Sequence, residues 1–261
     1  MDEATVVMPQ FSEESPAPFL RAQWKLLVML NYEIDPAVLE PFVPAGTELD
    51  TFNGTTYVSM VGFLFLNTRV LGVPVPFHRN FEEVNLRFYV RRQTEQQEIR
   101  RGVVFVKEIV PKRAIAFLAR KLYQENYVAM PMAHEIAYQN AYPTDPQSVC
   151  YKWKFRSRWN ALTIQTSGAA ISTVEGTEEE FITEHYWGYT RHPDGSTSEY
   201  RVEHPRWQIW KANSCALDCD VAALYGPQFS SFVQGEPSSA FLADGSDVIV
   251  RMGRKLRCGS E

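Results

Sequence analysis

The pattern of apolar and polar positions in the stretch 102–131 (GVVFVKEIVPKRAIAFLARKLYQENYVAMP) predicts a strand, a helix and the start of another strand. Residues 103–110 are β-branched and mostly apolar, and Pro111 begins a break. Apolar residues then recur at helical spacing, at Ile115, Leu118, Ala119 and Leu122. The helix ends in the polar and aromatic run 123–127, which makes this stretch our first candidate for a pocket wall.

The stretch 83–92 alternates regularly, which is typical of a strand with two different faces. The apolar face, which we assign to the core, consists of Val84, Leu86, Phe88 and Val90. The other face consists of Glu83, Asn85, Arg87, Tyr89 and Arg91. A solvated face is the commoner arrangement for an antiparallel strand, and a polar barrel interior is the alternative. The alternation by itself leaves this choice open.

Turn and capping signals divide the rest of the chain. Further strands are predicted over 24–34, 55–66, 151–156 and 161–167, in two aromatic segments of 185–212 around the turn 193–196, and as a hairpin in 239–252 around Asp244-Gly245. Short helices are predicted over 35–40, 177–185 and 220–225. The stretch 67–80 contains one glycine and two prolines, so we expect a long loop there and consider it a candidate cover for a ligand site.

Many strands and few helices indicate an α+β, β-rich fold, with a closed or nearly closed β structure flanked by short helices. A chain of 261 residues with 45% hydrophobic content can bury a large core. We expect a single domain over 19–253, a flexible lead-in over 1–18 and a mobile basic tail over 254–261.

The net charge of −5 argues against a dedicated nucleic-acid-binding protein, which usually has a basic face. No run approaches the roughly 20 apolar residues of a membrane span, and the first residues are acidic where a signal peptide is basic. We therefore expect a cytoplasmic protein whose partner is a small molecule, with no nucleic acid and no membrane. The sequence is also compatible with a homo-oligomer.

Sequence motifs for metals and for common catalytic sites are absent. Of the four cysteines only Cys215 and Cys219 are close together, and no histidine follows at zinc-site spacing, so we expect reduced, structural cysteines. The five histidines form no HxH or HExxH pair. There is no GxSxG elbow, P-loop, dinucleotide-binding glycine motif or EF-hand loop. We expect no cofactor and no metal.

A resemblance to a known family is carried by four segments: WKLLVMLNYEIDPAVLEPFVPAG, NFEEVNLRFYV, RAIAFLARKLYQENY and VEHPRWQIW. Together they resemble the uncharacterised YqjF-like family of bacterial proteins, which belongs to the acetoacetate decarboxylase-like superfamily. The match spans most of the chain. It implies a conical β-barrel of mostly antiparallel strands, with helices packed outside it and a pocket in its interior.

The decarboxylases of this superfamily use a lysine that forms a Schiff base with a keto acid, its pKa lowered by a neighbouring cation and by desolvation. Alignment of residues 114–116 and 119–122 with the decarboxylase pattern places Tyr127 and Val128 where the lysine pair stands in those enzymes. A phenol cannot form an imine, so the resemblance implies that this route of decarboxylation is lost. It also places Glu83 at a pocket glutamate and Lys25 at a pocket arginine, the alternative for Lys25 being a surface lysine at a strand edge.

Three further residues are candidates for chemistry. Lys107 and Lys112 are possible replacement amines, although solvent exposure is the commoner state of a lysine. Arg113, next to Lys112, would lower the pKa of that lysine. His204 is a candidate general acid or base if it points into the barrel, and a hydrogen-bonded structural histidine otherwise.

Two functional hypotheses follow. In the first, the barrel binds a small carboxylate-bearing or aromatic molecule. In the second, the chain is an enzyme that acts on a carbonyl or keto-acid substrate, by acid/base chemistry through Glu83 and Tyr127 or by decarboxylation with a relocated lysine. The first is favoured because no nucleophile is visible. The candidate ligand-binding residues are Glu83, Asn85, Arg87, Tyr127, Lys25 and His204.

Overall fold

The computed structural model describes residues 16–74, 78–112, 126–138 and 145–256. The strands on either side of the helix predicted after Pro111 are included, whereas the helix itself lies outside the described residues. The strands are β1 (Pro18–Ile34), β2 (Glu48–Leu49), β3 (Thr56–Val70), β4 (Val73–Pro74), β5 (Phe81–Gln93), β6 (Ile99–Val110), β7 (Tyr127–Ala129), β8 (Met132–Tyr138), β9 (Pro146–Phe155), β10 (Arg158–Thr166), β11 (Ile171–Ser172), β12 (Trp187–Arg191), β13 (Thr197–Glu203), β14 (Gln208–Asp218), β15 (Ser239–Arg251) and β16 (Arg254–Lys255). The helices are α1 (Pro36–Leu39), the 3-10 turn η1 (Glu40–Phe42), α3 (Glu178–Thr183), α4 (Val221–Tyr225) and α5 (Pro227–Val233).

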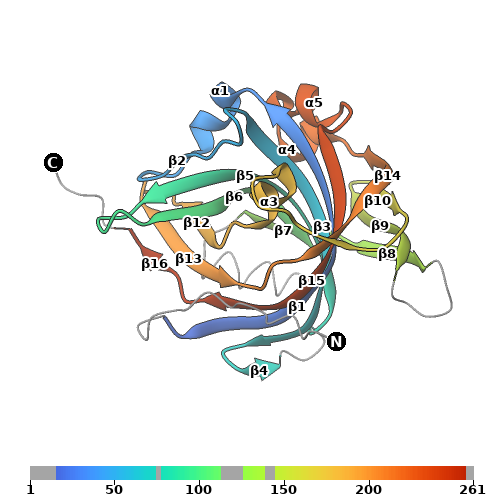
Figure 1. The fold of residues 1–261 in the computed structure, drawn as a ribbon, viewed down its shortest axis with the longest axis horizontal. Coiled ribbons are helices and arrows are strands. Elements are labelled where there is room, and N and C mark those ends of the chain that lie inside the picture. The colour runs from blue at the N-terminus through green and yellow to red at the C-terminus, as the bar shows by residue number, and fades with distance from the viewer. Residues whose placement is uncertain (1–15, 75–77, 113–125, 139–144, 257–261) are drawn as a thin grey trace.

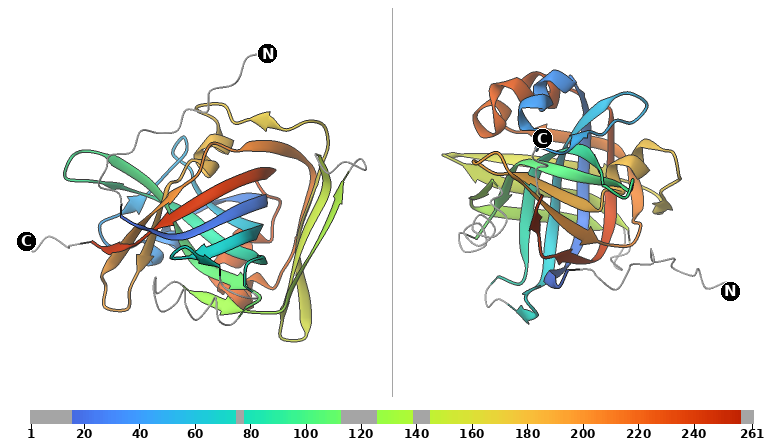
Figure 2. Two further views of the ribbon diagram at one scale, coloured as in Figure 1. Left: turned by 90° about the horizontal axis from the view of Figure 1, so that it is seen from below. Right: turned by 90° about the vertical axis from the view of Figure 1, so that its left-hand side faces the viewer.

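The central strands form a ring in the order β13-β12-β6-β5-β3-β1-β15, which closes because β15 pairs with both β1 and β13. Figure 1 shows this ring, with α3 lying across one end of it. The sheet continues beyond β15 through β14, β10, β9 and β8, which form a layer beside the ring (Figure 2, left). The prediction of a β-rich fold with a few short helices is confirmed.

The middle parts of β3 and β5 are buried on both faces. On the outer face, Leu86 and Phe88 of β5 belong to the same buried cluster as Trp153 of β9. On the inner face, Phe63 of β3 and Tyr89 of β5 belong to a second cluster. Because the additional layer and helices α4 and α5 pack on the outer face, the middle residues of β3 and β5 are shielded from water on both sides.

This arrangement decides the question that the alternation of residues 83–92 left open. Glu83, Asn85, Arg87 and Tyr89 are 2%, 1%, 8% and 1% exposed. The commoner arrangement, a solvated face, is therefore wrong for this strand. Only Arg91, near the end of β5, is exposed. The polar face lies inside the ring, where its side chains can form a site.

Two predicted connections are wrong. The stretch 67–80 is not one long loop, since β3 continues to Val70, turns tightly and returns as β4. The stretch 239–252 is not a hairpin, since β15 is continuous. At Gly245 the backbone has φ of 76°, and a Cβ atom there would lie 2.0 Å from the carbonyl oxygen of Trp24. The Asp-Gly pair thus marks a close approach of two strands rather than a turn.

The predicted helix starts are confirmed. Side chains of Asp35, Thr177 and Asp220 accept hydrogen bonds from backbone N–H groups in the first turns of α1, α3 and α4. In the segment 254–261, which was predicted from the sequence to be a mobile tail, Arg254 and Lys255 form β16, which pairs with β13. Cysteines 150, 215 and 219 are free, as expected, while Cys258 lies outside the described residues. Within the described part of the chain, no helix has the length and apolar character to cross a membrane.

Candidate functional site

A cavity of about 340 Å³ lies inside the ring. Side chains from all the ring strands, from β7 and from the segment after α3 line it. Its size is within the range of small-molecule sites, roughly 300–1,000 Å³. The inner face of the sheet therefore encloses a space that could hold a compact organic molecule.

Aromatic side chains form a large part of the cavity wall. Trp24 of β1 meets the edge of Phe63 at a centroid distance of 5.2 Å, and Phe65 is stacked on Phe81 at 4.7 Å. The ring of Trp207 also contacts Trp24, with the two centroids 6.3 Å apart. Such rings present flat apolar surface with well-defined packing geometry, which suits an apolar or aromatic ligand.

A polar network occupies one part of the wall. Asn85 donates a hydrogen bond of 2.9 Å from Nδ2 to Oε1 of Glu83, and the hydroxyl of Tyr127 donates to Oε2 of Glu83 at 3.3 Å. Glu83 and Asn85 are neighbours on the inner face of β5, and Tyr127 begins β7, which pairs with β6. The structure thus brings together three of the predicted site residues. Both oxygens of the buried carboxylate have partners, as burial requires.

Arg87 also lines the cavity, and its guanidinium is poorly paired. Among the described residues, it donates one hydrogen bond, from Nη2 to the carbonyl oxygen of Ile182 at 3.4 Å, and its Nε has no partner. No carboxylate of the described residues forms an ion pair with it. A buried guanidinium without a carboxylate partner is energetically costly, so this group is available to an anion that enters the cavity.

His185 follows α3 and also lines the cavity, although no sequence pattern pointed to it. Its Nε2 lies 3.1 Å from Oδ2 of Asp50, which also accepts a 2.7 Å hydrogen bond from Nε of Arg101. Burial acts to raise the pKa of Asp50, but the hydrogen bonds and charges of these two partners lower it overall. The carboxylate is therefore ionised, and Nε2 of His185 is the hydrogen-bond donor. Burial lowers the pKa of His185 to about 4 in spite of the Asp50 hydrogen bond. The imidazole is therefore neutral near pH 7.

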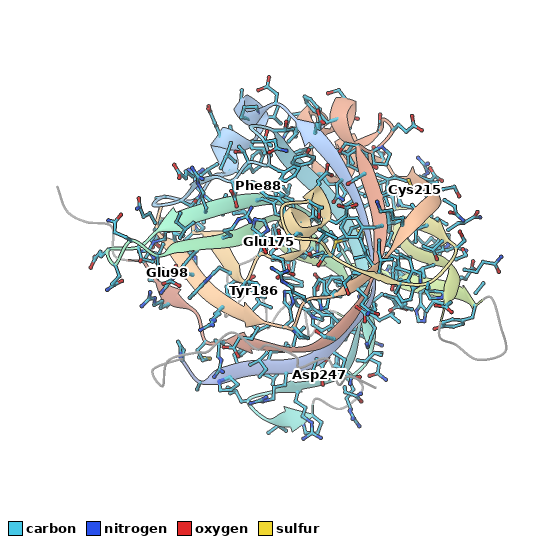
Figure 3. All side chains as sticks on the ribbon, in the orientation of Figure 1. Phe88, Glu98, Glu175, Tyr186, Cys215 and Asp247 are labelled. Carbon is cyan, nitrogen blue, oxygen red and sulfur yellow. The ribbon has the colours of Figure 1, made fainter. Side chains whose placement is uncertain are left out.

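His204 follows β13 and is among the residues that line the cavity. Its ring is stacked on Trp207, with centroids 4.1 Å apart and planes at 18°, and Tyr186 lies against it at 4.8 Å (Figure 3 labels Tyr186). Nδ1 lies 3.0 Å from the carbonyl oxygen of Pro205. Burial lowers the pKa of His204 to about 4, and the charge of Arg87 lowers it further against the opposing effect of the Pro205 carbonyl. His204 is thus hydrogen-bonded and also lines the cavity, while its role as a general acid or base stays a prediction.

Glu108 is a second buried carboxylate of the cavity, 1% exposed, and the sequence did not single it out. Val103 and Phe105 of β6 line the cavity, and strict alternation would add Lys107 to them. Instead, Leu86 pairs with Lys107 and Arg87 pairs with Phe105, which leaves Val106 as an extra residue in β6. This β-bulge turns Glu108 inward and Lys107 outward. The alternation of apolar and polar residues along β6 does not reveal a bulge of this kind.

None of the predicted lysines is among the described side chains that line the cavity. Nζ of Lys25 donates to the carbonyl oxygen of Gly245 at 3.2 Å. Lys107 donates to the carbonyl oxygen of Leu224 on the outer side of the ring, where burial lowers its pKa. It is half-buried, so the expectation of solvent exposure is wrong for Lys107, whereas Lys112 is exposed. No group of three or more metal-ligating side chains is present among the described residues.

Several proteins of known sequence or structure are similar to this chain. The uncharacterized protein YqjF of Bacillus subtilis (strain 168) is 25% identical over 201 residues, which cover 75% of this chain and 76% of YqjF. The crystal structure of acetoacetate decarboxylase from Legionella pneumophila is similar with a TM-score of 0.65 and 13% identity, over 98% of this chain and 94% of that one. The enduracididine biosynthesis enzyme MppR complexed with pyruvate also has a TM-score of 0.65, with 12% identity over 96% of this chain and 95% of that one.

The expected resemblance to the YqjF-like family and the acetoacetate decarboxylase-like fold is confirmed by these matches. At 12–13% identity the solved structures establish the fold and nothing about activity. A family described as "Uncharacterized conserved protein" matches residues 21–247, which include nearly the whole ring. The chain therefore belongs to the DUF2071 family of uncharacterized conserved proteins.

Proposed function

We propose that this protein binds a small molecule that carries a carboxylate on an apolar or aromatic body, inside the ring of strands. The observation that carries the proposal is Arg87, a guanidinium buried in an aromatic cavity with no carboxylate partner among the described residues. An uncompensated buried charge costs several kcal/mol, as an order of magnitude. A ligand carboxylate would offset this cost, because guanidinium and carboxylate groups can form two parallel hydrogen bonds.

The rest of the wall supports an apolar body on the ligand. Trp24, Phe63, Phe65 and Phe81 present ring surfaces to the cavity. Burial of apolar surface contributes roughly 25 cal/mol per Å², so an aromatic ring in contact with this wall adds several kcal/mol before the entropy of binding is subtracted. A compact aryl or alkyl carboxylate matches both parts of the cavity.

We further propose that the protein has no Schiff-base decarboxylase activity. The residue aligned with the reactive lysine of the decarboxylases is Tyr127, whose hydroxyl is hydrogen-bonded to Glu83. Lys25, Lys107 and Lys112 are not among the residues that line the cavity. No described lysine is thus available to form an imine with a ligand held by Arg87.

An enzymatic function is the second candidate, and the contact between Tyr127 and Glu83 favours it. A tyrosine hydroxyl that donates to a buried carboxylate is the kind of pair that can pass a proton to or from a carbonyl substrate. MppR, a protein of similar fold, forms a complex with pyruvate, which makes 2-oxo acids suitable first compounds to test. In this second candidate Glu83 and Tyr127 act as acid and base, with no covalent intermediate.

Calorimetric titration with phenylacetate and phenylacetamide tests the binding proposal, because the two compounds differ in charge and share the aromatic body. We expect phenylacetate to bind at least about tenfold more tightly, which corresponds to about 1.4 kcal/mol. Arg87→Met removes this preference. Arg91→Met is the matched control, since Arg91 lies on the same strand but pairs with Glu48 at the surface. Equal affinity for the acid and the amide would overturn the proposal.

Reduction with borohydride in the presence of pyruvate tests the absence of an imine. We expect the mass of the protein to stay unchanged, because no described lysine lines the cavity. A reduced pyruvate adduct that maps to a lysine, and that disappears when phenylacetate competes, would contradict this part of the proposal.

A further inference from the structure

We propose that His204 is a general base that removes a proton from the carbon next to the carbonyl of a 2-oxo acid bound to Arg87. This inference rests on the proposed carboxylate site at Arg87 and adds a reaction to it. It concerns a different base from the pair formed by Glu83 and Tyr127.

The hydrogen bond of His204 fixes its tautomer. A backbone carbonyl oxygen can only accept, so Nδ1, which lies 3.0 Å from the oxygen of Pro205, carries the proton. Nε2 then has a free lone pair. It makes no hydrogen bond with any described residue. Because His204 is among the residues that line the cavity, we assign this lone pair to the cavity side.

The orientation of the ring is also fixed. Trp207 and Tyr186 hold the imidazole from its two sides at centroid distances of 4.1 Å and 4.8 Å. Rotation about the Cβ–Cγ bond would break the Pro205 hydrogen bond and the stacking together. Because a general base acts only when its lone pair is held within reach of the proton, this rigid support is the geometry that proton abstraction requires.

The charge of Arg87 affects both the proposed ligand and the pKa of His204. Burial is the main cause of the low pKa of His204, and the charge of Arg87 acts in the same direction. A ligand carboxylate on Arg87 neutralises this charge, so binding moves the pKa of His204 upward, toward the range in which a base works near neutral pH. The base therefore becomes stronger when the substrate is in place.

The reaction balances without a cofactor. Nε2 of His204 takes a proton from C3 of the 2-oxo acid, the electrons of the C–H bond form the C2–C3 double bond, and the carbonyl electrons move to oxygen. The enolate oxygen is next to the carboxylate, and a further N–H of the Arg87 guanidinium stabilises it by donating a hydrogen bond. In D₂O the proton on Nε2 of the His204 imidazolium exchanges with solvent, and transfer of a deuteron back to C3 then restores the ketone with deuterium in place of hydrogen.

The experiment follows phenylpyruvate in D₂O by proton NMR, with its binding measured separately by calorimetry. Phenylpyruvate has a carboxylate, a carbonyl and an aromatic ring, and its C3 exchange in buffer alone gives the baseline rate. We expect the protein to accelerate loss of the C3 signal, and His204→Asn to lower the rate by about a hundredfold, the usual contribution of a general base. Asparagine keeps a donor for the Pro205 carbonyl and has no basic nitrogen.

Controls separate His204 from the other candidates. His134→Asn changes an exposed histidine outside the cavity and leaves the rate unchanged. Glu83→Gln keeps most of the exchange if His204 is the base. In His204→Ala, added imidazole restores exchange by entering the slot between Tyr186 and Trp207, an effect that a purely structural role would not produce.

The outcomes distinguish this inference from the binding proposal. If phenylpyruvate binds in an Arg87-dependent manner but its C3 protons exchange no faster than in buffer, His204 is not a base and the carboxylate site stands. If exchange persists in His204→Asn and is lost in Glu83→Gln, Glu83 is the base and this inference is wrong. If phenylpyruvate does not bind, the carboxylate site itself fails for this ligand and the inference fails with it.

Discussion

Nε2 of His185 lies 3.1 Å from Oδ2 of Asp50, although 135 positions separate the two residues in the sequence. Arg101 donates to the same carboxylate, and its side chain is 36% exposed, so the contact links a fully buried ring to the protein surface. The imidazole is packed against Tyr89 and Phe181 at centroid distances of 4.7 Å and 5.1 Å. Burial keeps it neutral, with a pKa of about 4.

This buried histidine makes the stability of the protein dependent on pH. The unfolded chain protonates His185 near pH 6.5, and the folded chain does so near pH 4. The unfolded state therefore binds more protons between these values. The stabilisation is complete above pH 6.5 and decreases as the pH falls toward 4, by up to about 1.4 kcal/mol per pH unit. His204, with the same low pKa, acts in the same direction.

Denaturation by urea at pH 7, 6 and 5 measures this effect. We expect the free energy of unfolding to decrease from pH 7 to pH 5, and to decrease less in His185→Gln, whose amide can still donate to Asp50 but does not titrate. The control is His134→Gln at an exposed position. The same pH dependence in wild type and His185→Gln would show that this ring does not control acid stability.

Replacement of Arg87 separates stability from binding. Arg87→Met removes a buried charge that no described carboxylate compensates, and it keeps the aliphatic volume. We expect the ligand-free protein to become about 1–3 kcal/mol more stable, in line with buried charges replaced by apolar side chains. Arg101→Met, which removes one of the two partners of the buried Asp50 carboxylate, should instead destabilise the protein. Thermal unfolding of the three proteins without ligand checks the prediction, and a less stable Arg87→Met protein would contradict it.

Glu199 of β13 holds together the strands at one side of the ring. Its fully buried carboxylate accepts from Arg92, Arg100 and Arg254, at 2.8–3.2 Å. Glu199→Ala leaves these guanidinium groups without a shared partner, and we expect a loss of about 3–5 kcal/mol.

A surface ion pair provides the comparison for Glu199. Glu48→Ala breaks the exposed pair with Arg91, which should cost no more than about 1 kcal/mol. Urea denaturation of both variants gives the two values. Similar losses in the two would show that burial of the Glu199 cluster adds nothing.

Gly245 is required where β15 passes β1. Alanine there combines a positive φ with a Cβ atom 2.0 Å from the carbonyl oxygen of Trp24, so the strands must separate. We expect Gly245→Ala to cost more than the about 1–2 kcal/mol of the backbone conformation alone. Gly195→Ala has a φ of 81° and no neighbouring atom within 4 Å, so it measures that backbone cost by itself. Equal effects of the two substitutions in thermal unfolding would refute the proposed steric role.

Local signals in the chain identified many of the elements, and the resemblance of four segments identified the family of this protein. Alternation identified β5, and capping residues such as Asp35 identified the helix starts. The family resemblance placed Glu83 in a pocket, and Glu83 does line the cavity. The face of a strand, by contrast, is buried or solvated according to what packs on it, and those partners are distant in the chain. Only the closed ring decided that Glu83, Asn85 and Arg87 point inward.

The remaining features needed the tertiary structure for a related reason. The bulge at Val106 changes the phase of β6 and brings Glu108, not Lys107, into the cavity. Asp244-Gly245 has the composition of a turn, yet the neighbouring strand makes it a point of close approach. His185 became a site residue through its contact with Asp50 and its place in the cavity wall, which no spacing in the sequence records. Strand register and the packing of residues far apart in the chain are properties of the assembled sheet, so they could not be predicted from local pattern.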